Sequence, residues 1–276
     1  MPTARSNSPK VSKTKKIRIN ADGTLREAVV DEQARIRLDD RVLELKDTRL
    51  RPVTEQPVIC VALNYAGHYD ELADTLQHPP YKQPPRQPVF FIKPRNTLAG
   101  HLGEIPCPDG TDLIYTGAGL GFVIGRTASR VTREQGLDYV GGYTIYNDFT
   151  LAEDSYFRPP VTTKCLDGYG PVGPYIMDPE EITGPHDLAI STYVNGELKQ
   201  TASTNDLRLP IPAIIEELTE FMTLAPGTVI VSGFPPDRVA VQPGDEVRVE
   251  IEQIGSLVNR IVKDVDQPVT ALTVDT

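Results

Sequence analysis

Cysteine is scarce in this chain, whose 276 residues include only Cys60, Cys107 and Cys165. The three positions are too far apart for a zinc knuckle, and their odd number argues against a secreted disulfide framework. We therefore expect a protein of a reducing compartment, the cytoplasm.

Long apolar runs are missing as well. The longest, such as residues 58–63, fall far short of the ~20 residues that a membrane-spanning helix needs. Residues 1–16 carry several basic side chains but no apolar stretch, which argues against a secretory signal. We expect a disordered basic tail at residues 1–16, and no membrane partner.

Positive charge is in deficit. Lysine and arginine number 28 against 38 aspartates and glutamates, and the net charge is −10. Proteins that bind nucleic acid usually present a basic face, so nucleic acid is not an expected partner. Local lysines can still form a positive pocket for an anionic substrate.

Turn-forming residues are abundant, with 25 prolines and 21 glycines, and hydrophobic residues make up 39% of the chain. This composition is typical of a globular protein with many short strands. We expect a small β-meander at residues 17–55, a main domain at 56–265 and a C-terminal tail at 266–276. Strands are predicted at residues 58–63, 89–93, 143–145, 228–233 and 246–252, and short helices at 132–140 and 211–224. The predicted fold class is α+β with β dominant.

One predicted strand, within residues 115–126, has an unusual alternation. Its even positions carry apolar side chains that share one face, whereas the opposite face is almost bare, with glycine at three alternate positions. The apolar residues are Ala118, Leu120, Phe122 and Ile124, and the glycines are Gly117, Gly119 and Gly121. Glycine weakens a strand interior, so this spacing usually marks the close approach of another group. The bare face is either a binding surface or a site that has lost its side chains.

A dinucleotide-binding turn is another explanation for these glycines. It requires Gly-x-Gly-x-x-Gly between a strand and a helix. Here the sixth position is Phe122, and the residues after it continue as a strand. We therefore expect no nucleotide cofactor.

His68 and Glu71 are the first candidates for chemistry. They are three residues apart and can meet on one face of a helical turn. A carboxylate that orients an imidazole makes a general base. The alternative is an ordinary pair on the protein surface.

Further candidates are basic residues and one aspartate. Lys93 ends an apolar strand, and Lys164 precedes a turn-rich segment. Lysines in such places are usually only solvated, but together with Arg95 or Arg158 they would bind a dicarboxylate and stabilise an enolate. Asp148 ends another buried strand and is either a metal ligand or a turn residue. Magnesium needs several oxygen ligands, so Asp148 alone makes a poor site.

Eight short motifs follow one another along the chain. They lie at residues 61–65 with His68 and Glu71, and at 91–94, 123–126, 142–148, 164–174, 193–196, 226–230 and 243–245 with 255–259. In this order they resemble the fumarylacetoacetate hydrolase family over roughly residues 56–262. The resemblance implies a β-dominated fold of layered mixed sheets, a β-sandwich roll with a few short helices.

The resemblance also implies a set of site residues. The implied catalytic residues are His68, Glu71, Lys93 and Lys164, and the implied substrate-binding residues are Asn64, Tyr65, Arg95, Arg158 and Gly233.

The family's metal site is altered in this chain. Family members hold a divalent cation, Mg²⁺ or Mn²⁺, with two glutamates on alternate strand positions and one aspartate downstream. The resemblance places the aspartate at Asp148 and the two glutamates at Gly117 and Gly119, so the glutamate pair is absent. Gly-Phe-Pro at residues 233–235 replaces the family's Gly-Thr-Pro motif, and Ala152 replaces the arginine that usually follows the metal aspartate.

These departures resemble one branch of the family, a decarboxylase of homoprotocatechuate breakdown that also lacks the glutamate pair. Residues 81–85, 91–97, 153–159 and 163–168 are similar to this branch. The resemblance implies a carboxy-lyase that removes carbon dioxide from a 5-oxopentene-tricarboxylate, with enol–keto isomerase activity as a second reaction. Lys93, Lys164 and backbone N–H groups would stabilise the enolate, and His68 would move the proton.

Two other functions stay open at this point. One is a non-catalytic subunit that supports a metal-bearing paralogue, and the other is a metal-dependent hydrolase of acylpyruvates. Family members are usually dimers, so we expect a homodimer or a mixed assembly with such a paralogue.

Overall fold

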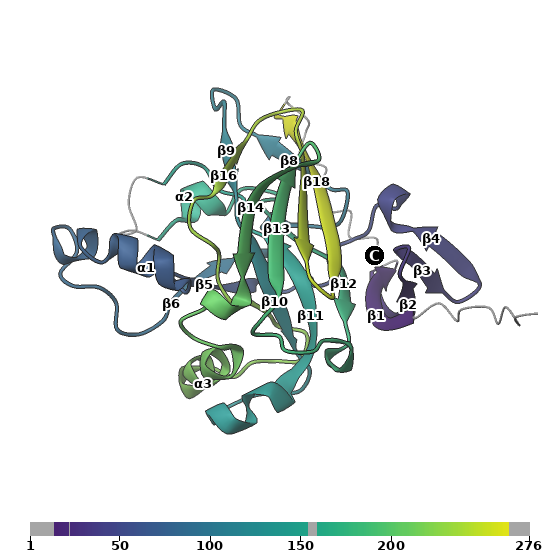
Figure 1. Ribbon diagram of the computed structural model, residues 1–276, viewed down its shortest axis with the longest axis horizontal. Coiled ribbons are helices and arrows are strands. Elements are labelled where there is room, and N and C mark those ends of the chain that lie inside the picture. The colour runs from purple at the N-terminus through teal and green to yellow at the C-terminus, as the bar shows by residue number, and fades with distance from the viewer. Residues whose placement is uncertain (1–13, 22, 154–158, 265–276) are drawn as a thin grey trace, which may run out of the picture.

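The computed structural model describes residues 14–21, 23–153 and 159–264. Two β-sheets dominate the fold, and a two-stranded ribbon and short helices complete it (Figure 1). The predicted α+β class with β dominant is confirmed. No helix within the described ranges has the length and apolar character that crossing a bilayer requires.

The larger sheet has eleven strands and carries the site. In spatial order its strands are β4 (Arg41–Glu44), β3 (Arg35–Leu38), β2 (Thr24–Asp31), β1 (Thr14–Ala21), β12 (Gly170–Met177), β11 (Val140–Asn147), β10 (Ala118–Ile124), β15 (Val229–Val231), β5 (Val58–Ala62) and β6 (Val89–Lys93), with β7 (Leu98–Ala99) beside β12. The pairs are antiparallel except β15 with β5 and β12 with β7.

A five-stranded sheet lies against the middle of the larger one. Its strands are β14 (Glu197–Ser203), β13 (Ala189–Val194), β17 (Glu246–Ile251), β18 (Gly255–Lys263) and β8 (Glu104–Cys107), and the separate ribbon consists of β16 (Val239–Val241) and β9 (Ile114–Thr116). Contacts of β10 with β13, β11 with β17 and β12 with β18 join the two layers.

The helices are short and connect the strands. The α-helices are α1 (Ala66–Leu72), α2 (Val161–Lys164) and α3 (Ile211–Phe221), and the 3₁₀ helices are η1 (Leu45–Asp47), η2 (Thr75–Gln77), η3 (Arg95–Thr97), η4 (Arg133–Tyr139), η5 (Pro179–Glu181) and η6 (Thr204–Asp206). The short helix predicted at residues 132–140 is therefore η4, a 3₁₀ helix. Thr132 precedes it, but its side chain makes no capping hydrogen bond to the backbone.

The alternation predicted for β10 is confirmed. Ala118, Leu120, Phe122 and Ile124 all belong to the main core, together with residues of the five-stranded sheet and of α3. All seven residues of the strand are buried, because its glycine face is covered as well. The bare face predicted from the sequence is therefore filled by other groups.

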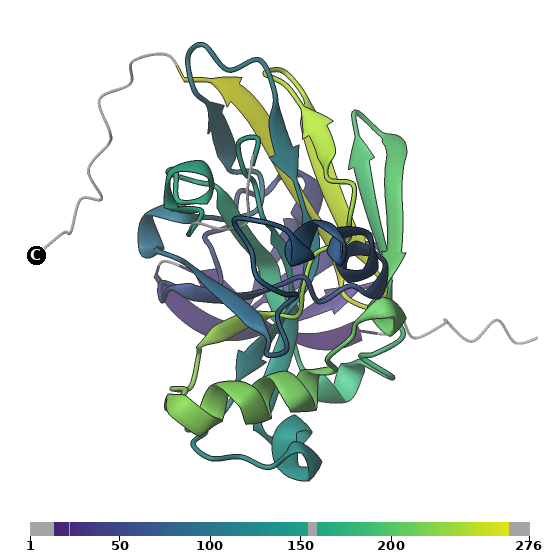
Figure 2. The same ribbon diagram turned by 90° about the vertical axis from the view of Figure 1, so that its left-hand side faces the viewer.

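Helix α3 covers the lower end of the sheet beside η4 (Figure 2). Its apolar side chains at Ile211, Ile214, Ile215 and Leu218 are buried in the core. The helix ends at Phe221, earlier than the predicted 224, because Met222 adopts an extended conformation. The Phe221 side chain is exposed and lies outside the core.

The N-terminal meander consists of β1 to β4 and lies at the opposite end of the molecule from α1 (Figure 1). β1 pairs with β12, where Ile17 is the partner of Met177, so the meander extends the larger sheet. The strand begins at Thr14, inside the segment predicted as a tail. Residues 1–13, and residues 265–276 with the predicted C-terminal tail, lie outside the described ranges.

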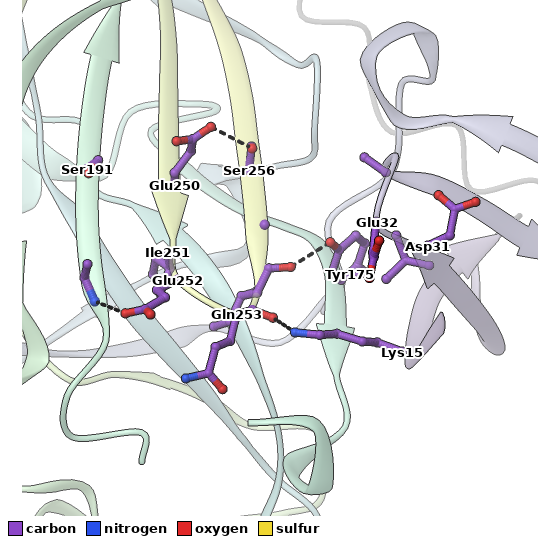
Figure 3. A pocket seen from close by; sticks show the side chains of 15 residues that line it. Lys15, Asp31, Glu32, Tyr175, Ser191, Glu250, Ile251, Glu252, Gln253 and Ser256 are labelled. Carbon is purple, nitrogen blue, oxygen red and sulfur yellow. Dashed lines mark hydrogen bonds between the residues drawn. The ribbon is translucent and has the colours of Figure 1, made fainter. Parts of the chain in front are cut away.

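A cavity of about 550 Å³ lies where the meander meets the five-stranded sheet (Figure 3). Lys15 Nζ donates to the carbonyl of Gln253 at 2.6 Å, and the Tyr175 hydroxyl donates to the carbonyl of Ile254 at 2.7 Å. Both bonds reach the turn between β17 and β18. This junction therefore ties the meander and β12 to the second sheet.

Candidate active site

A second cavity, of about 650 Å³, lies at the end of the larger sheet near α1 and α2. One part of its wall is apolar, from Leu76, Pro85, Phe90, Phe91 and Phe234, and the other part is charged, from His68, Glu153, Lys164 and Arg238. An apolar cavity with a few convergent polar groups is the usual form of a small-molecule site. It is the candidate active site.

Asp148 lies behind the charged wall and is bonded to two of its cations, Lys164 and Arg238. It directly follows β11 and is fully buried. Lys93 Nζ donates to its Oδ1 at 2.8 Å, while Lys164 Nζ and Arg238 Nη2 donate to its Oδ2 at 3.0 and 2.6 Å. Arg238 Nη1 also donates to the Asp148 carbonyl at 2.7 Å. Three cations therefore surround one carboxylate.

Different elements bring these side chains together. Lys93 is the last residue of β6, Lys164 ends α2, and Arg238 directly precedes β16. Lys93 is completely buried and also donates to the carbonyl of Phe149 at 3.1 Å. Lys164 is paired with Glu153 at 2.8 Å as well. With two carboxylates against three cations, this group keeps an excess of positive charge that suits an anionic ligand.

The charges shift the pKa values of the buried members. Burial by itself raises the pKa of Asp148, but Lys164, Lys93 and Arg238 outweigh it and hold that pKa well below its ordinary value. Burial lowers the pKa of Lys93, against the opposing effect of Asp148. Since each charge stabilises the other, Asp148 stays ionised at neutral pH.

His68 lies on α1 and lines the cavity, half-buried. Burial first, and the charge of Arg238 second, lower its pKa. The imidazole is therefore neutral at neutral pH and can accept a proton. Glu71 lies on the same helix, is exposed, and raises the pKa of His68 through its charge. Its predicted role as the orienting carboxylate stays a prediction.

Asn64, Tyr65 and Gly233 lie together, but none of them lines the cavity. The Asn64 amide donates to the carbonyls of Leu209 and Ser232 at 3.0 and 2.6 Å, and its Oδ1 accepts from the Leu209 N–H at 2.9 Å. Tyr65 is buried, and burial raises its pKa. Gly233 has a φ of 144°, and a Cβ there would lie 3.0 Å from that of Asn64. These contacts tie β5 and β15 to the loop before α3.

The remaining predicted substrate-binding residues are arginines. Arg95 is exposed and pairs with Glu55 at 2.9 Å, and it does not line the cavity. Arg158 lies outside the described residues. The structure thus brings His68 and Lys164 to the cavity wall, with Lys93 behind Asp148, and places Arg95 elsewhere.

The predicted metal position next to Asp148 holds a side chain. A Cβ added at Gly117 would lie 2.9 Å from Cζ of Arg238 and closer still to Nη1. A Cβ added at Gly119 would lie 2.6 Å from Cγ1 of Val231 and 2.8 Å from the carbonyl oxygen of Gly233. Neither position has room for a glutamate in this arrangement.

The donor set does not fit a divalent cation either. Both oxygens of Asp148 accept hydrogen bonds from cations, which a metal ion would have to displace. The described part of the chain contains no group of three or more His, Cys, Asp or Glu side chains arranged for a metal. Hard divalent cations need several oxygen ligands. The residues present here do not supply them.

Arg238 is a charged residue of the cavity wall that the sequence motifs did not indicate. It follows the Gly-Phe-Pro segment at residues 233–235 by three positions. A usable signal was the combination of two missing carboxylates with an arginine near an altered motif. A site that lacks the carboxylate ligands of its metal ion can obtain positive charge from a basic side chain nearby.

This fold and site define a class of β-rich enzymes with a charged pocket at the end of a mixed sheet. The chain belongs to the fumarylacetoacetate hydrolase family, since the model described as "Fumarylacetoacetate (FAA) hydrolase C-terminal" matches residues 57–262.

Several similar proteins are named as isomerases or decarboxylases. The chain is 42% identical to the 4-hydroxyphenylacetate degradation bifunctional isomerase/decarboxylase of Salmonella dublin over 207 residues, which are 74% of this chain and 46% of that protein. It is 28% identical to 5-carboxymethyl-2-hydroxymuconate delta-isomerase of Mycobacterium smegmatis, whose crystal structure gives a TM-score of 0.72 over 91% of this chain and 99% of that one. The chain spans about half the length of the bifunctional relatives that it matches.

One similar structure holds a metal. Maleylpyruvate hydrolase of Sphingobium sp. SYK-6, in complex with manganese(II) and pyruvate, is 25% identical, with a TM-score of 0.71 over 90% of this chain and 99% of that one. The family therefore includes a metal-bound member, whereas the residues described above do not fit a metal.

Proposed function

We propose that this chain is a carboxy-lyase of aromatic catabolism that decarboxylates a 5-oxopentene-tricarboxylate or a close analogue. The observation that carries the proposal is the cluster of Lys93, Lys164 and Arg238 around Asp148, beside an apolar wall. Identity to bifunctional isomerase/decarboxylases supports it, although the chain spans about half of their length.

The reaction needs a sink for electrons. The bond to the departing carboxylate breaks, and its electron pair moves through the conjugated double bond onto the oxo oxygen, which becomes an enolate. Lys164 and Arg238 on the cavity wall stabilise that negative charge. Lys93 acts through Asp148, because it is buried behind the carboxylate that holds the other two cations.

The apolar wall has a complementary role. A carboxylate placed against Phe90, Phe91 and Leu76 would lose its hydration, whereas carbon dioxide is uncharged and fits an apolar surface. The oxo-acid end of the substrate therefore faces the cations and the departing carboxylate faces the aromatic side.

His68 moves a proton in the second reaction, after water has protonated the enolate oxygen to give the enol. A neutral imidazole takes a proton from one position of the enol and returns it at another, which converts enol and keto forms. Isomerisation thus uses the same enolate, and relatives named as isomerases support it as the second activity.

The test is a direct assay of purified protein with the tricarboxylate. Loss of the substrate's ultraviolet absorbance and release of carbon dioxide are expected, with and without EDTA. Lys164→Ala should lower kcat/KM by about 10²-fold or more, since it removes one donor to the developing charge. Lys199→Ala, an exposed lysine paired with Glu197, is the matched control and should leave it unchanged.

Other results would favour the alternatives. If the chain is inactive alone, and Lys164→Ala and His68→Ala leave the activity of an assembled complex unchanged, it is a non-catalytic subunit. Turnover of acylpyruvates without release of carbon dioxide would identify a hydrolase. We propose a cytoplasmic homodimer, and size-exclusion chromatography with light scattering separates it from a mixed assembly.

A further inference from the structure

Arg238 reaches the site through the pairing of two short strands. In the β9–β16 ribbon, Val239 is the partner of Thr116. The residue before one strand therefore lies beside the residue after the other, which places Arg238 beside Gly117. The guanidinium occupies the space that a side chain at Gly117 would fill.

The guanidinium is held in a fixed orientation. Two N–H groups bond Asp148, one to the carbonyl and one to the carboxylate. The ring of Phe234 lies 5.2 Å from Cζ, a distance that allows a cation–π contact. The side chain is 21% exposed and lines the cavity, so its outer edge is accessible to a ligand. A guanidinium carries five N–H donors in one plane, which suits two oxygens at once.

The presence of two glycines in place of the family's two glutamates also changes the charge of the site. Two glutamates and a divalent cation have no net formal charge, whereas two glycines and Arg238 carry one positive charge, which no chelator removes. This excess charge favours a polyanion. It is part of the protein and does not depend on a supply of metal.

We infer that Arg238 is the catalytic cation of this site and takes the place of a divalent metal. It binds the oxo and carboxylate oxygens of a 2-oxo acid, and its N–H bonds strengthen as the oxo oxygen becomes an enolate. The inference rests on the proposed decarboxylation for its catalytic part, but binding of a 2-oxo acid can be measured by itself. Gly117 is the matching residue, because only glycine leaves room for the guanidinium.

The first experiment measures turnover in EDTA. The wild type should keep its activity, and added Mg²⁺ or Mn²⁺ should not raise it. Arg238→Ala should lose about 10²-fold or more in kcat, and guanidinium chloride should restore part of the loss whereas Mg²⁺ should not. Arg133→Ala is the matched control, because Arg133 is an exposed arginine of η4 that pairs with Glu216 of α3. Activity lost in EDTA and restored by Mn²⁺, or an Arg238→Ala variant as active as Arg133→Ala, would overturn the inference.

The second experiment measures binding without turnover. Oxalate imitates the enolate of a 2-oxo acid, and calorimetry in EDTA should detect its binding to the wild type. The Kd should rise at least about 10-fold in Arg238→Ala, the order expected for a lost charge-assisted bond. If the wild type does not turn over the tricarboxylate, the proposed function fails, while the oxalate result still decides whether Arg238 binds a 2-oxo acid.

Gly117→Ala provides an independent variant that keeps the arginine. The added methyl should displace the guanidinium and lower kcat by roughly 10²-fold, as small misplacements of a catalytic group do. Gly67→Ala is the control, because a Cβ there meets no atom within 4 Å. Full activity of Gly117→Ala, with circular dichroism showing that both variants are folded, would contradict the placement of Arg238.

Discussion

Asp148 balances the charge of the pocket, and its removal tests that balance. In Asp148→Asn, Lys93 and Lys164 would be left buried without their shared carboxylate. Breaking a buried pair in this way typically costs about 3–5 kcal/mol, so we expect the free energy of unfolding to fall by that order. Urea unfolding followed by circular dichroism measures it. Asp39→Asn, which removes an exposed pair with Arg26, should cost less than about 1 kcal/mol.

The effect of Asp148→Asn on the free energy of unfolding should depend on pH. The three cations outweigh burial and lower the folded-state pKa of Asp148 below the ordinary value of about 4. A carboxylate with a lowered pKa contributes stability above its unfolded pKa and loses it as the pH falls towards the folded pKa. The difference in unfolding free energy between wild type and Asp148→Asn should therefore be complete at neutral pH and shrink below about pH 4. A difference that stays constant down to pH 3 would contradict this account.

His68 makes a separate prediction about catalysis. Burial, with a further effect from Arg238, lowers its pKa below the ordinary value of about 6.5. Since the neutral form accepts the proton of the enol, kcat/KM for the enol–keto isomerisation should fall as the pH drops through that lowered pKa. Glu71→Gln removes a charge that raises the pKa, so the fall should move to lower pH. The pH profile of kcat/KM, measured for the wild type and for Glu71→Gln, checks this. A shift of the fall to higher pH in Glu71→Gln would contradict it.

At the scale of elements, the sequence predicts those features whose pattern lies within one short segment of the chain. The alternation at residues 118–124 and the helical spacing from Ile211 to Leu218 are repeated within a few residues, and both elements are confirmed. The contact of Arg238 with Gly117 depends on pairing between β9 and β16, which lie far apart in the sequence. No local pattern encodes that pairing. The glycines were therefore visible, but the group that fills their place was not.

Helix α3 gives the prediction at this scale. Ile215 is fully buried in the main core. Ile215→Ala should lower the free energy of unfolding by about 2–5 kcal/mol, because it leaves a cavity. Glu220→Ala on the exposed side of the same helix should change it by less than about 0.5 kcal/mol. Urea unfolding compares the two. Activity per folded molecule should be equal, since α3 supplies no residue to the cavity wall.

At the scale of the whole molecule, the meander raises the question of independent folding. The sequence indicates its strands through turns and alternation, but not their partner. The partner is β12, which pairs with β1 through Ile17 with Met177 and Arg18 with Ile176. Ile17, Ile19 and Ile36 from the meander belong to the same core cluster as Ile145 of β11 and Ile215 of α3. One continuous core therefore spans the meander, the larger sheet and α3.

We expect this continuity to make the described part of the chain unfold as one unit. Opening the meander alone would expose Ile17, Ile19 and the edge of β12 to water, at about 25 cal/mol for each Å² of apolar surface. Hydrogen exchange should therefore give amides of β1 and β2 the same free energy of opening as amides of β10 and β11, and one shared transition in urea. Tyr175→Phe, which loses the hydroxyl bond to Ile254, should lower both values together by about 1 kcal/mol. If β1 and β2 exchange at a clearly lower free energy than β10, the meander is a separate unit and the shared core does not couple them.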